Sequence, residues 1–114
     1  LLDATAKKLK VVDAVCEQTG TENVKTIHAR LEEHKDQYDF VVSRAVTRLP
    51  QFIRWTRKNI SKNNINTLPN GIIYIKGGDV EAELEGRKNF QIRDIADFFE
   101  EEFFETKKLV WIAD

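Results

Sequence analysis

Two kinds of apolar periodicity alternate along this chain, and this alternation constrains the fold more than any other feature. Short apolar runs such as "FVV" at residues 40–42 and "IIYI" at 72–75 are typical of buried strands. Between them, apolar residues recur at helical spacing, as in residues 4–20, where Gly20 is a predicted helix C-terminal glycine. The predicted order is β-α-β-β-α-β-α-β-β, with strands at 1–3, 23–29, 38–43, 71–77, 87–98 and 106–113 and helices at 4–20, 49–60 and 78–86.

This alternation predicts an α/β fold built on a mostly parallel, doubly wound sheet. No helix separates the last two predicted strands, so we expect them to pair antiparallel. The 114 residues fit one domain, 1–114. Because the sequence opens on "LLD", which reads as the end of a strand already under way, we expect that domain to be truncated at its N-terminus.

Composition narrows the class of protein. Hydrophobic residues make up 41% and charged residues 32% of the chain. This balance is typical of globular domains. No apolar run is long enough to span a bilayer, so no membrane partner is expected. A single cysteine, Cys16, suits a reducing cytoplasm. His28 and His34 stand apart without metal-ligand spacing, so no metal site is predicted.

Charge is distributed unevenly. Residues 1–62 hold 12 Lys and Arg against 8 Asp and Glu, whereas residues 63–114 hold 6 against 11. A basic half can form a face for nucleic acid. The alternative is two solvated surfaces of unequal sign. The same alternatives apply to the basic run at helical spacing between residues 54 and 62, whereas "FEEEFFE" at 99–105 predicts an acidic loop held by aromatic residues.

Charged or polar residues follow several predicted strands at their ends. Ligands of parallel sheets bind outside the carboxyl ends of the strands, at the edge that we call the rim. Asp3, Arg30, Arg44 and Lys76–Gly77 are all predicted to lie there. Asp3 suits ribose hydroxyls as a hydrogen-bond acceptor, or it caps a helix. Arg44 either faces a ligand or marks the point where a strand reaches water.

The combined segments "LLDATAKKLKVVDAV", "NV", "HARLEE" and "YDFVVSRAV", followed by a strand ending in "KG", resemble the small-subunit ribosomal RNA methyltransferase G family, also called the glucose-inhibited division protein B family. The pairing of "DAT…KK" with "SRA" is a fairly specific part of this resemblance, and the resemblance covers essentially the whole chain. It implies a Rossmann-like class I methyltransferase fold, S-adenosylmethionine as the cofactor, and methylation of N7 of a guanine in 16S ribosomal RNA in the cytoplasm.

The resemblance also implies roles for individual residues. Arg44 is expected at the cofactor and at the target base, as the catalytic residue. Lys76–Gly77 is expected to border the same rim. The cofactor ribose and adenine are expected to contact Asp3, Ala4, Thr5, Leu31 and Glu32. Apart from the resemblance, positive charge predicts contacts with RNA phosphates, which position the substrate, for Lys7, Lys8, Lys10, Arg48, Arg54 and Lys76.

One element of the family pattern is missing from these residues, namely the glycine-rich loop that approaches the methionine end of the cofactor. We therefore expect the 114 residues alone to bind S-adenosylmethionine weakly. The alternative function is a nucleoside- or RNA-binding α/β module without chemistry. A glycine-rich strand-loop encoded just upstream of Leu1 would favour the enzyme.

Overall fold

The structure is a computed structural model, and it describes residues 1–44 and 47–113. The chain divides into two compact units, Leu1–Lys35 and Asp36–Asp114, and each is described by itself. The prediction that residues 1–114 form a single domain stays a prediction.

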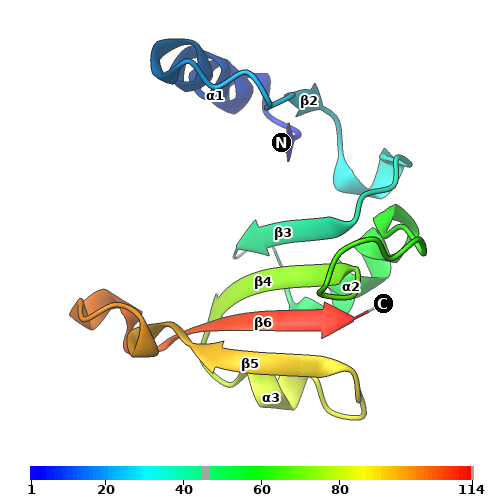
Figure 1. The fold of residues 1–114 in the computed structure, drawn as a ribbon, viewed down its shortest axis with the longest axis vertical. Helices are drawn as coiled ribbons and strands as arrows, with labels where there is room; N and C mark the ends of the chain where they lie inside the picture. Colours follow the sequence, from blue (N-terminus) through cyan, green and yellow to red (C-terminus); the bar gives the residue numbers. More distant parts are fainter. Residues whose placement is uncertain (45–46, 114) are drawn as a thin grey trace. The chain divides into compact units, whose positions relative to one another are not determined.

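The first unit is a strand–helix–strand segment (Figure 1). Strand β1 (Leu2–Asp3) pairs in parallel with β2 (Ile27–His28), and helix α1 (Ala6–Thr19) connects them. The helix ends at Gly20, whose φ of 69° is the left-handed conformation that favours glycine at this position. A 3-10 turn, η1 (Leu31–Glu33), follows β2.

The second unit contains a four-stranded sheet in the order β3-β4-β6-β5. Strands β3 (Phe40–Arg44) and β4 (Gly71–Gly77) are parallel, and β6 (Lys107–Ala113) runs antiparallel to both β4 and β5 (Phe90–Asp94). Strands β3, β4 and β5 therefore run in one direction, and β6 lies between two of them in the opposite direction (Figure 1). The predicted α/β class and the antiparallel final pair are confirmed, and the four-stranded sheet is mixed, with one parallel and two antiparallel pairings.

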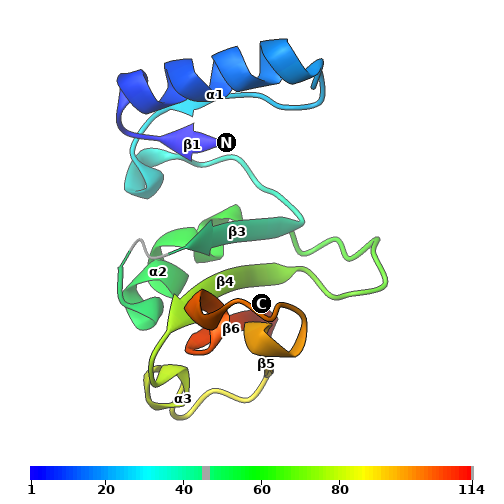
Figure 2. The same ribbon diagram turned by 90° about the vertical axis from the view of Figure 1, so that its left-hand side faces the viewer.

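Helices α2 (Leu49–Thr56) and α3 (Val80–Glu83) lie on the same side of this sheet (Figure 2). Side chains alternate between the faces of a strand, so every second residue of β4 and β6 points toward the helices. The ring of Tyr74 packs there against Phe52, with centroids 5.1 Å apart. The largest side chains of this core are fully buried, namely Leu49, Phe52, Tyr74, Val80, Leu84 and Val110.

Strands β4 and β6 approach each other closely at Gly71, the first residue of β4. A methyl group added at this position would overlap the main-chain carbonyl oxygen of Ile112 on β6. At Gly77, the last residue of β4, an added methyl group would find its nearest atoms at 3.4 Å, which is ordinary contact distance. Only the first of these two glycines is therefore required by packing.

Several elements are shorter than predicted. The strand predicted at 23–29 is limited to Ile27–His28, because the strand it pairs with, β1, is itself only two residues long. The strand predicted at 87–98 covers Phe90–Asp94, and the helix predicted at 78–86 covers Val80–Glu83. The helix predicted at 49–60 is an α-helix to Thr56 and then a 3-10 turn, η2 (Arg57–Asn59).

None of the helices within residues 1–44 and 47–113 has the length and apolar character that a membrane-spanning helix needs.

Candidate functional site

In the first unit, the ends of β1 and β2 meet at one edge. Asp3 and His28 are register partners in the parallel pair. The main-chain N–H of Ala29 donates to the carbonyl of Asp3 at 3.2 Å, and His28 Nε2 lies 3.1 Å from the carbonyl oxygen of Ala4. These contacts hold the two strand ends together. The sequence does not predict that His28 lies beside Asp3, because this proximity depends on the register between β1 and β2.

The carboxylate of Asp3 supports the turn between β1 and α1. Its Oδ1 accepts a hydrogen bond of 2.8 Å from the main-chain N–H of Thr5. Thr5 itself is the N-cap residue of α1 and makes no side-chain capping bond. Asp3 Oδ2 has no hydrogen bond with any residue that the structure describes, so one carboxylate oxygen is available to a ligand.

The turn η1 begins three residues after β2, close in sequence to the same strand end. Leu31 is its first residue, and the first N–H groups of a helical turn have no partner inside the turn. The carbonyl of Arg30 accepts from the N–H of Glu33 at 3.1 Å and from that of His34 at 3.2 Å. The polar sequence of this segment predicts a turn or a helical turn, and the structure contains a helical turn.

In the second unit, Arg44 and Lys76 lie at the same end of neighbouring parallel strands. Arg44 pairs in register with Ile75, so Lys76 lies one residue further along β4. Alternation along the strands directs the two side chains to opposite faces of the sheet. Lys76 points to the face covered by α2 and α3, and Arg44 points to the other face, where it is exposed. The two residues therefore share a strand end but not a face.

Lys76 is held by the carboxylate of Glu83, which no pattern in the sequence indicates. Its Nζ lies 2.5 Å from Glu83 Oε2 and 2.6 Å from Glu83 Oε1, and Glu83 Oε1 also accepts from the main-chain N–H of Leu49 at 3.2 Å. Burial acts to raise the pKa of the Glu83 carboxyl. The bonds from Lys76 and Leu49, with the charges of Lys76 and Arg48, outweigh burial and hold that pKa below its usual value.

The other predicted phosphate contacts are exposed cations. Lys7, Lys8 and Lys10 lie on the first turns of α1, and Arg48 is the N-cap residue of α2. Arg54 lies in the last turn of α2. The predicted convergence of Asp3 and Leu31 with Arg44 on one rim involves both compact units, and it stays a prediction.

Known proteins are similar to this chain over nearly its whole length. The family model described as rRNA small subunit methyltransferase G matches residues 1–109. The ribosomal RNA small subunit methyltransferase G of Christiangramia forsetii is 47% identical over 112 residues, which cover 98% of this chain and 53% of that protein. The proteins of that name from Parabacteroides distasonis and Cytophaga hutchinsonii are 50% and 46% identical, and 49% and 55% of their lengths are covered. The chain spans about half the length of these relatives.

In the described sheet, β3 and β4 are parallel, and β6 is inserted between β4 and β5. This arrangement is typical of the Rossmann-like α/β fold of class I methyltransferases. Within that class, the family model that matches residues 1–109 is that of the rRNA small subunit methyltransferase G. The chain belongs to the rRNA small subunit methyltransferase G family.

Proposed function

We propose that the protein carrying this chain transfers a methyl group from S-adenosylmethionine to N7 of a guanine in 16S ribosomal RNA, in the cytoplasm. The observation that carries this proposal is family membership over residues 1–109. The relatives are named for a reaction on small-subunit ribosomal RNA. Residues at the strand ends of both compact units would hold the cofactor and the substrate.

The end of β1 is suited to the cofactor's ribose. Asp3 Oδ1 is occupied by the Thr5 N–H, while Oδ2 can accept from a ribose hydroxyl. The main chain of Ala4 and Thr5 follows directly, so the adenosine would lie along it. The N–H at the start of η1, at Leu31, can donate to an adenine ring nitrogen. We assign Leu31 and Glu32 to the adenine and Asp3 to the ribose.

The methyl transfer depends on how the base and the cofactor are positioned more than on proton transfer. S-adenosylmethionine supplies an activated methyl group when it is bound. Guanine N7 carries a lone pair and no proton, so the reaction needs no general base. The protein must therefore hold the base in line with the methyl group and favour the charge that develops.

Arg44 is the residue that we assign to the target base. Its guanidinium is exposed at the end of β3 and has no ion pair or hydrogen bond within the part of the chain that the structure describes. A guanidinium can donate to O6 of the guanine and orient the base while the N7 lone pair stays free to attack the methyl group. Lys7, Lys8 and Lys10 on α1, with Arg48 at the start of α2, would contact RNA phosphates and position the substrate.

The proposal is tested by methyl transfer with the full-length protein. Ribosomal RNA from a strain lacking its own methyltransferase of this family is incubated with the protein and radiolabelled S-adenosylmethionine. Strand cleavage specific for 7-methylguanine then locates the product. Label at one guanine of 16S RNA is the expected result. Binding of both S-adenosylmethionine and RNA without transfer would instead favour a binding module.

A further inference from the structure

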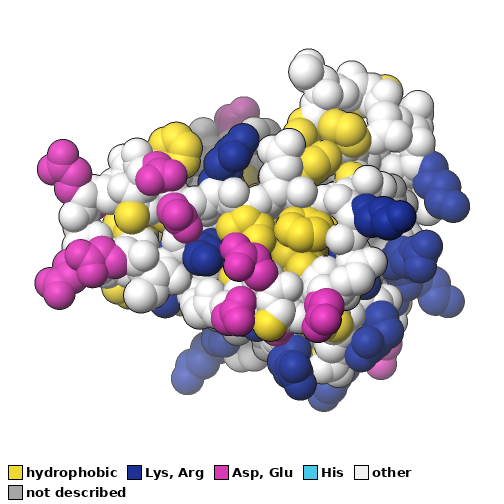
Figure 3. Space-filling view, turned by 90° about the horizontal axis from the view of Figure 1, so that it is seen from below, with side chains coloured by type: hydrophobic (Ala, Val, Ile, Leu, Met, Phe, Trp, Pro, Cys, Tyr) yellow, Lys and Arg dark blue, Asp and Glu magenta, His cyan; other side chains and the backbone are white. Residues whose placement is uncertain are grey.

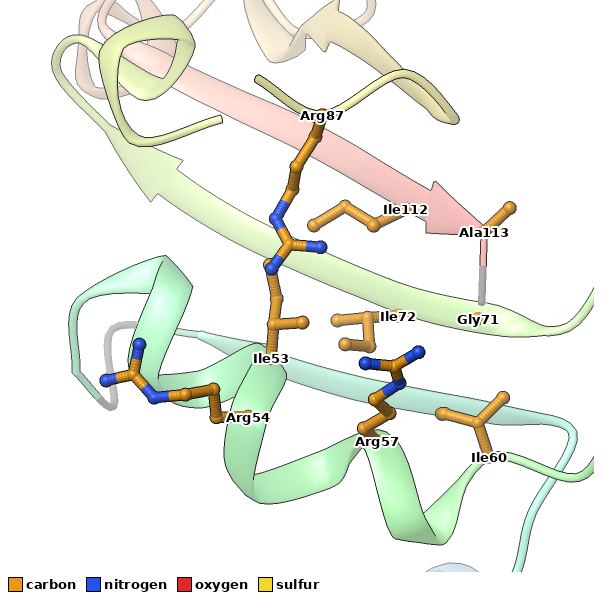
Figure 4. Close-up of a pocket in the computed structure, with 9 residues that line it drawn as sticks. All are labelled: Ile53, Arg54, Arg57, Ile60, Gly71, Ile72, Arg87, Ile112 and Ala113. Carbon is orange, nitrogen blue, oxygen red and sulfur yellow. The ribbon is translucent and has the colours of Figure 1, made fainter. Parts of the chain in front are cut away.

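A pocket lies at one end of the strands of the four-stranded sheet, and Arg44 and Lys76 lie at the other end. It has a volume of about 150 Å³ and is enclosed by α2, the first residues of β4, the last residues of β6 and the loop before β5 (Figure 4). We call it the arginine pocket. It is lined by Ile53, Arg54, Arg57, Ile60, Gly71, Ile72, Arg87, Ile112 and Ala113.

The floor of the arginine pocket is part of the core, and its mouth is cationic. The four isoleucines are buried, whereas the three arginines are exposed. The guanidinium groups of Arg57 and Arg87 come from opposite walls and point toward each other across the pocket, while that of Arg54 points away (Figure 4). Two positive groups thus face one hollow.

No carboxylate neutralises these two side chains in the part of the chain that the structure describes. Neither guanidinium has an ion pair or a hydrogen bond with any residue among 1–44 and 47–113. Cations that face one another repel, and an anion between them converts this repulsion into attraction. A guanidinium also matches the geometry of a phosphate, to which it donates two parallel hydrogen bonds.

The positive surface continues beyond the arginine pocket. A broader hollow of about 710 Å³ shares Arg54, Arg57 and Ile60 with it and is also lined by Lys62 and by several amide and hydroxyl side chains. In the space-filling view, Lys and Arg side chains are most numerous on the right, whereas Asp and Glu side chains lie at the left and in the centre (Figure 3). A row of cations leading out of a pocket suits a chain of phosphates better than one isolated anion.

We propose that Arg57 and Arg87 bind a backbone phosphate of RNA at a site remote from the reacting base. The proposal rests on the proposed function for the identity of the RNA. The pocket lies at Gly71, the first residue of β4, whereas Arg44 pairs in register with Ile75, four residues further along this strand. Four residues correspond to roughly 13 Å at the usual rise of a strand. The arginine pocket would therefore hold a phosphate other than that of the methylated guanine.

The test compares two double variants of the full-length protein that lose the same charge. Arg57→Gln with Arg87→Gln removes the two facing guanidinium groups. Lys88→Gln with Arg93→Gln removes two exposed cations that do not line the pocket. Affinity for a fluorescent hairpin copied from the substrate region of 16S RNA is measured at several salt concentrations, and circular dichroism checks the fold. Binding of inorganic pyrophosphate is measured in parallel.

The Arg57/Arg87 variant is expected to bind the hairpin about tenfold more weakly. The slope of log affinity against log salt concentration should decrease by the amount that corresponds to about one phosphate contact. The Lys88/Arg93 variant should stay within about threefold of wild type. In methyl transfer, the KM for RNA should rise while kcat is kept. If the Gln variant fails to fold, Arg57→Lys with Arg87→Lys keeps the charge and should still weaken binding, because lysine lacks the fork.

Equal RNA affinity of the two double variants would overturn the proposal. So would saturable pyrophosphate binding that needs Arg57 and Arg87 while the RNA affinity stays unchanged, because the pocket would then serve a small phosphate compound. Hairpin binding is measured without methyl transfer, so failure of the proposed reaction is distinguishable from failure of this site.

Discussion

Lys76 and Glu83 join the end of β4 to α3 through a salt bridge of 2.5 Å between Nζ and Oε2. Glu83 also accepts from the N–H of Leu49, the first residue of α2. A single carboxylate, only 13% exposed, therefore connects one strand end to two helices. This connection fixes the border of the candidate site in the second unit.

Glu83→Gln should lower the free energy of unfolding by about 1–2 kcal/mol, because it weakens two charge-assisted hydrogen bonds and leaves the Lys76 ammonium unpaired. Urea unfolding followed by circular dichroism measures this loss. Glu81→Gln, a change at an exposed position of the same helix, is the matched control. It should cost less than about 0.5 kcal/mol, as surface substitutions usually do. Equal losses from the two variants would contradict the role assigned to Glu83.

The same carboxylate predicts a pH dependence of stability. The pKa of Glu83 is lowered in the folded protein, so below the usual glutamate value the unfolded chain binds more protons than the folded one. The stabilisation is present above the ordinary pKa of a glutamate and is lost as the pH falls through the lowered folded pKa. The difference in unfolding free energy between wild type and Glu83→Gln should shrink over that range. A difference independent of pH would argue against a lowered pKa.

The new methyl group of Gly71→Ala would overlap the carbonyl oxygen of Ile112, and neither main chain can move away without breaking the β4–β6 pairing. This variant should therefore destabilise the second unit by about 3 kcal/mol. Gly77→Ala, at the other end of the same strand, should cost less than about 1 kcal/mol. Thermal unfolding of the two variants tests this contrast. A Gly71→Ala protein as stable as Gly77→Ala would show that the strands are less closely spaced there.

The fully buried hydroxyl of Tyr74 donates to the carbonyl of Thr47 at 2.8 Å. Tyr74→Phe should cost about 1–2 kcal/mol, because that carbonyl would lose its partner. Thr47 lies three residues after Arg44, so loss of this bond should reduce methyl transfer by the full-length protein as well as stability. Urea unfolding and initial-rate measurements give the two readouts, and a variant with unchanged stability and rate would contradict the prediction.

Arg44→Ala should reduce methyl transfer by at least a hundredfold and leave the fold intact, because the side chain is exposed and contributes little burial. Arg44→Lys should also be poor, since lysine keeps the charge and loses the planar fork. Methyl incorporation into small-subunit RNA is the measurement, with circular dichroism as the folding control. If Arg44→Ala stayed within about twofold of wild type, a change of only ~0.4 kcal/mol in barrier height, Arg44 would be a solvated strand end.

Local patterns predict the elements well where burial enforces them. Helical spacing places Leu49, Phe52, Ile53 and Ile60 on one face, and all four are buried. Gly20 caps α1 as expected, and Asp79 accepts a hydrogen bond from Ala82 at the start of α3. These features depend on neighbours in the sequence, which is why they can be predicted from it.

Features that depend on strand register cannot be predicted from spacing. The antiparallel pairing of the last two strands is expected from the sequence, but the position of β6 between β4 and β5 is not, because adjacency in a sheet is decided by contacts between distant segments. The salt bridge of Lys76 with Glu83 depends on how α3 packs against the end of β4. The approach of Arg57 and Arg87 across one pocket likewise requires segments thirty residues apart to fold together.

The position of β6 sets an order for folding during synthesis. Strands β3 and β4 can pair as soon as residue 77 has left the ribosome, whereas β5 has no partner in the described sheet until residues 107–113 appear. For that interval the segment Phe90–Asp94 presents unpaired main-chain groups, which is the state most open to association with another chain. The acidic stretch between β5 and β6 is synthesised during this interval, and its like charges discourage such association.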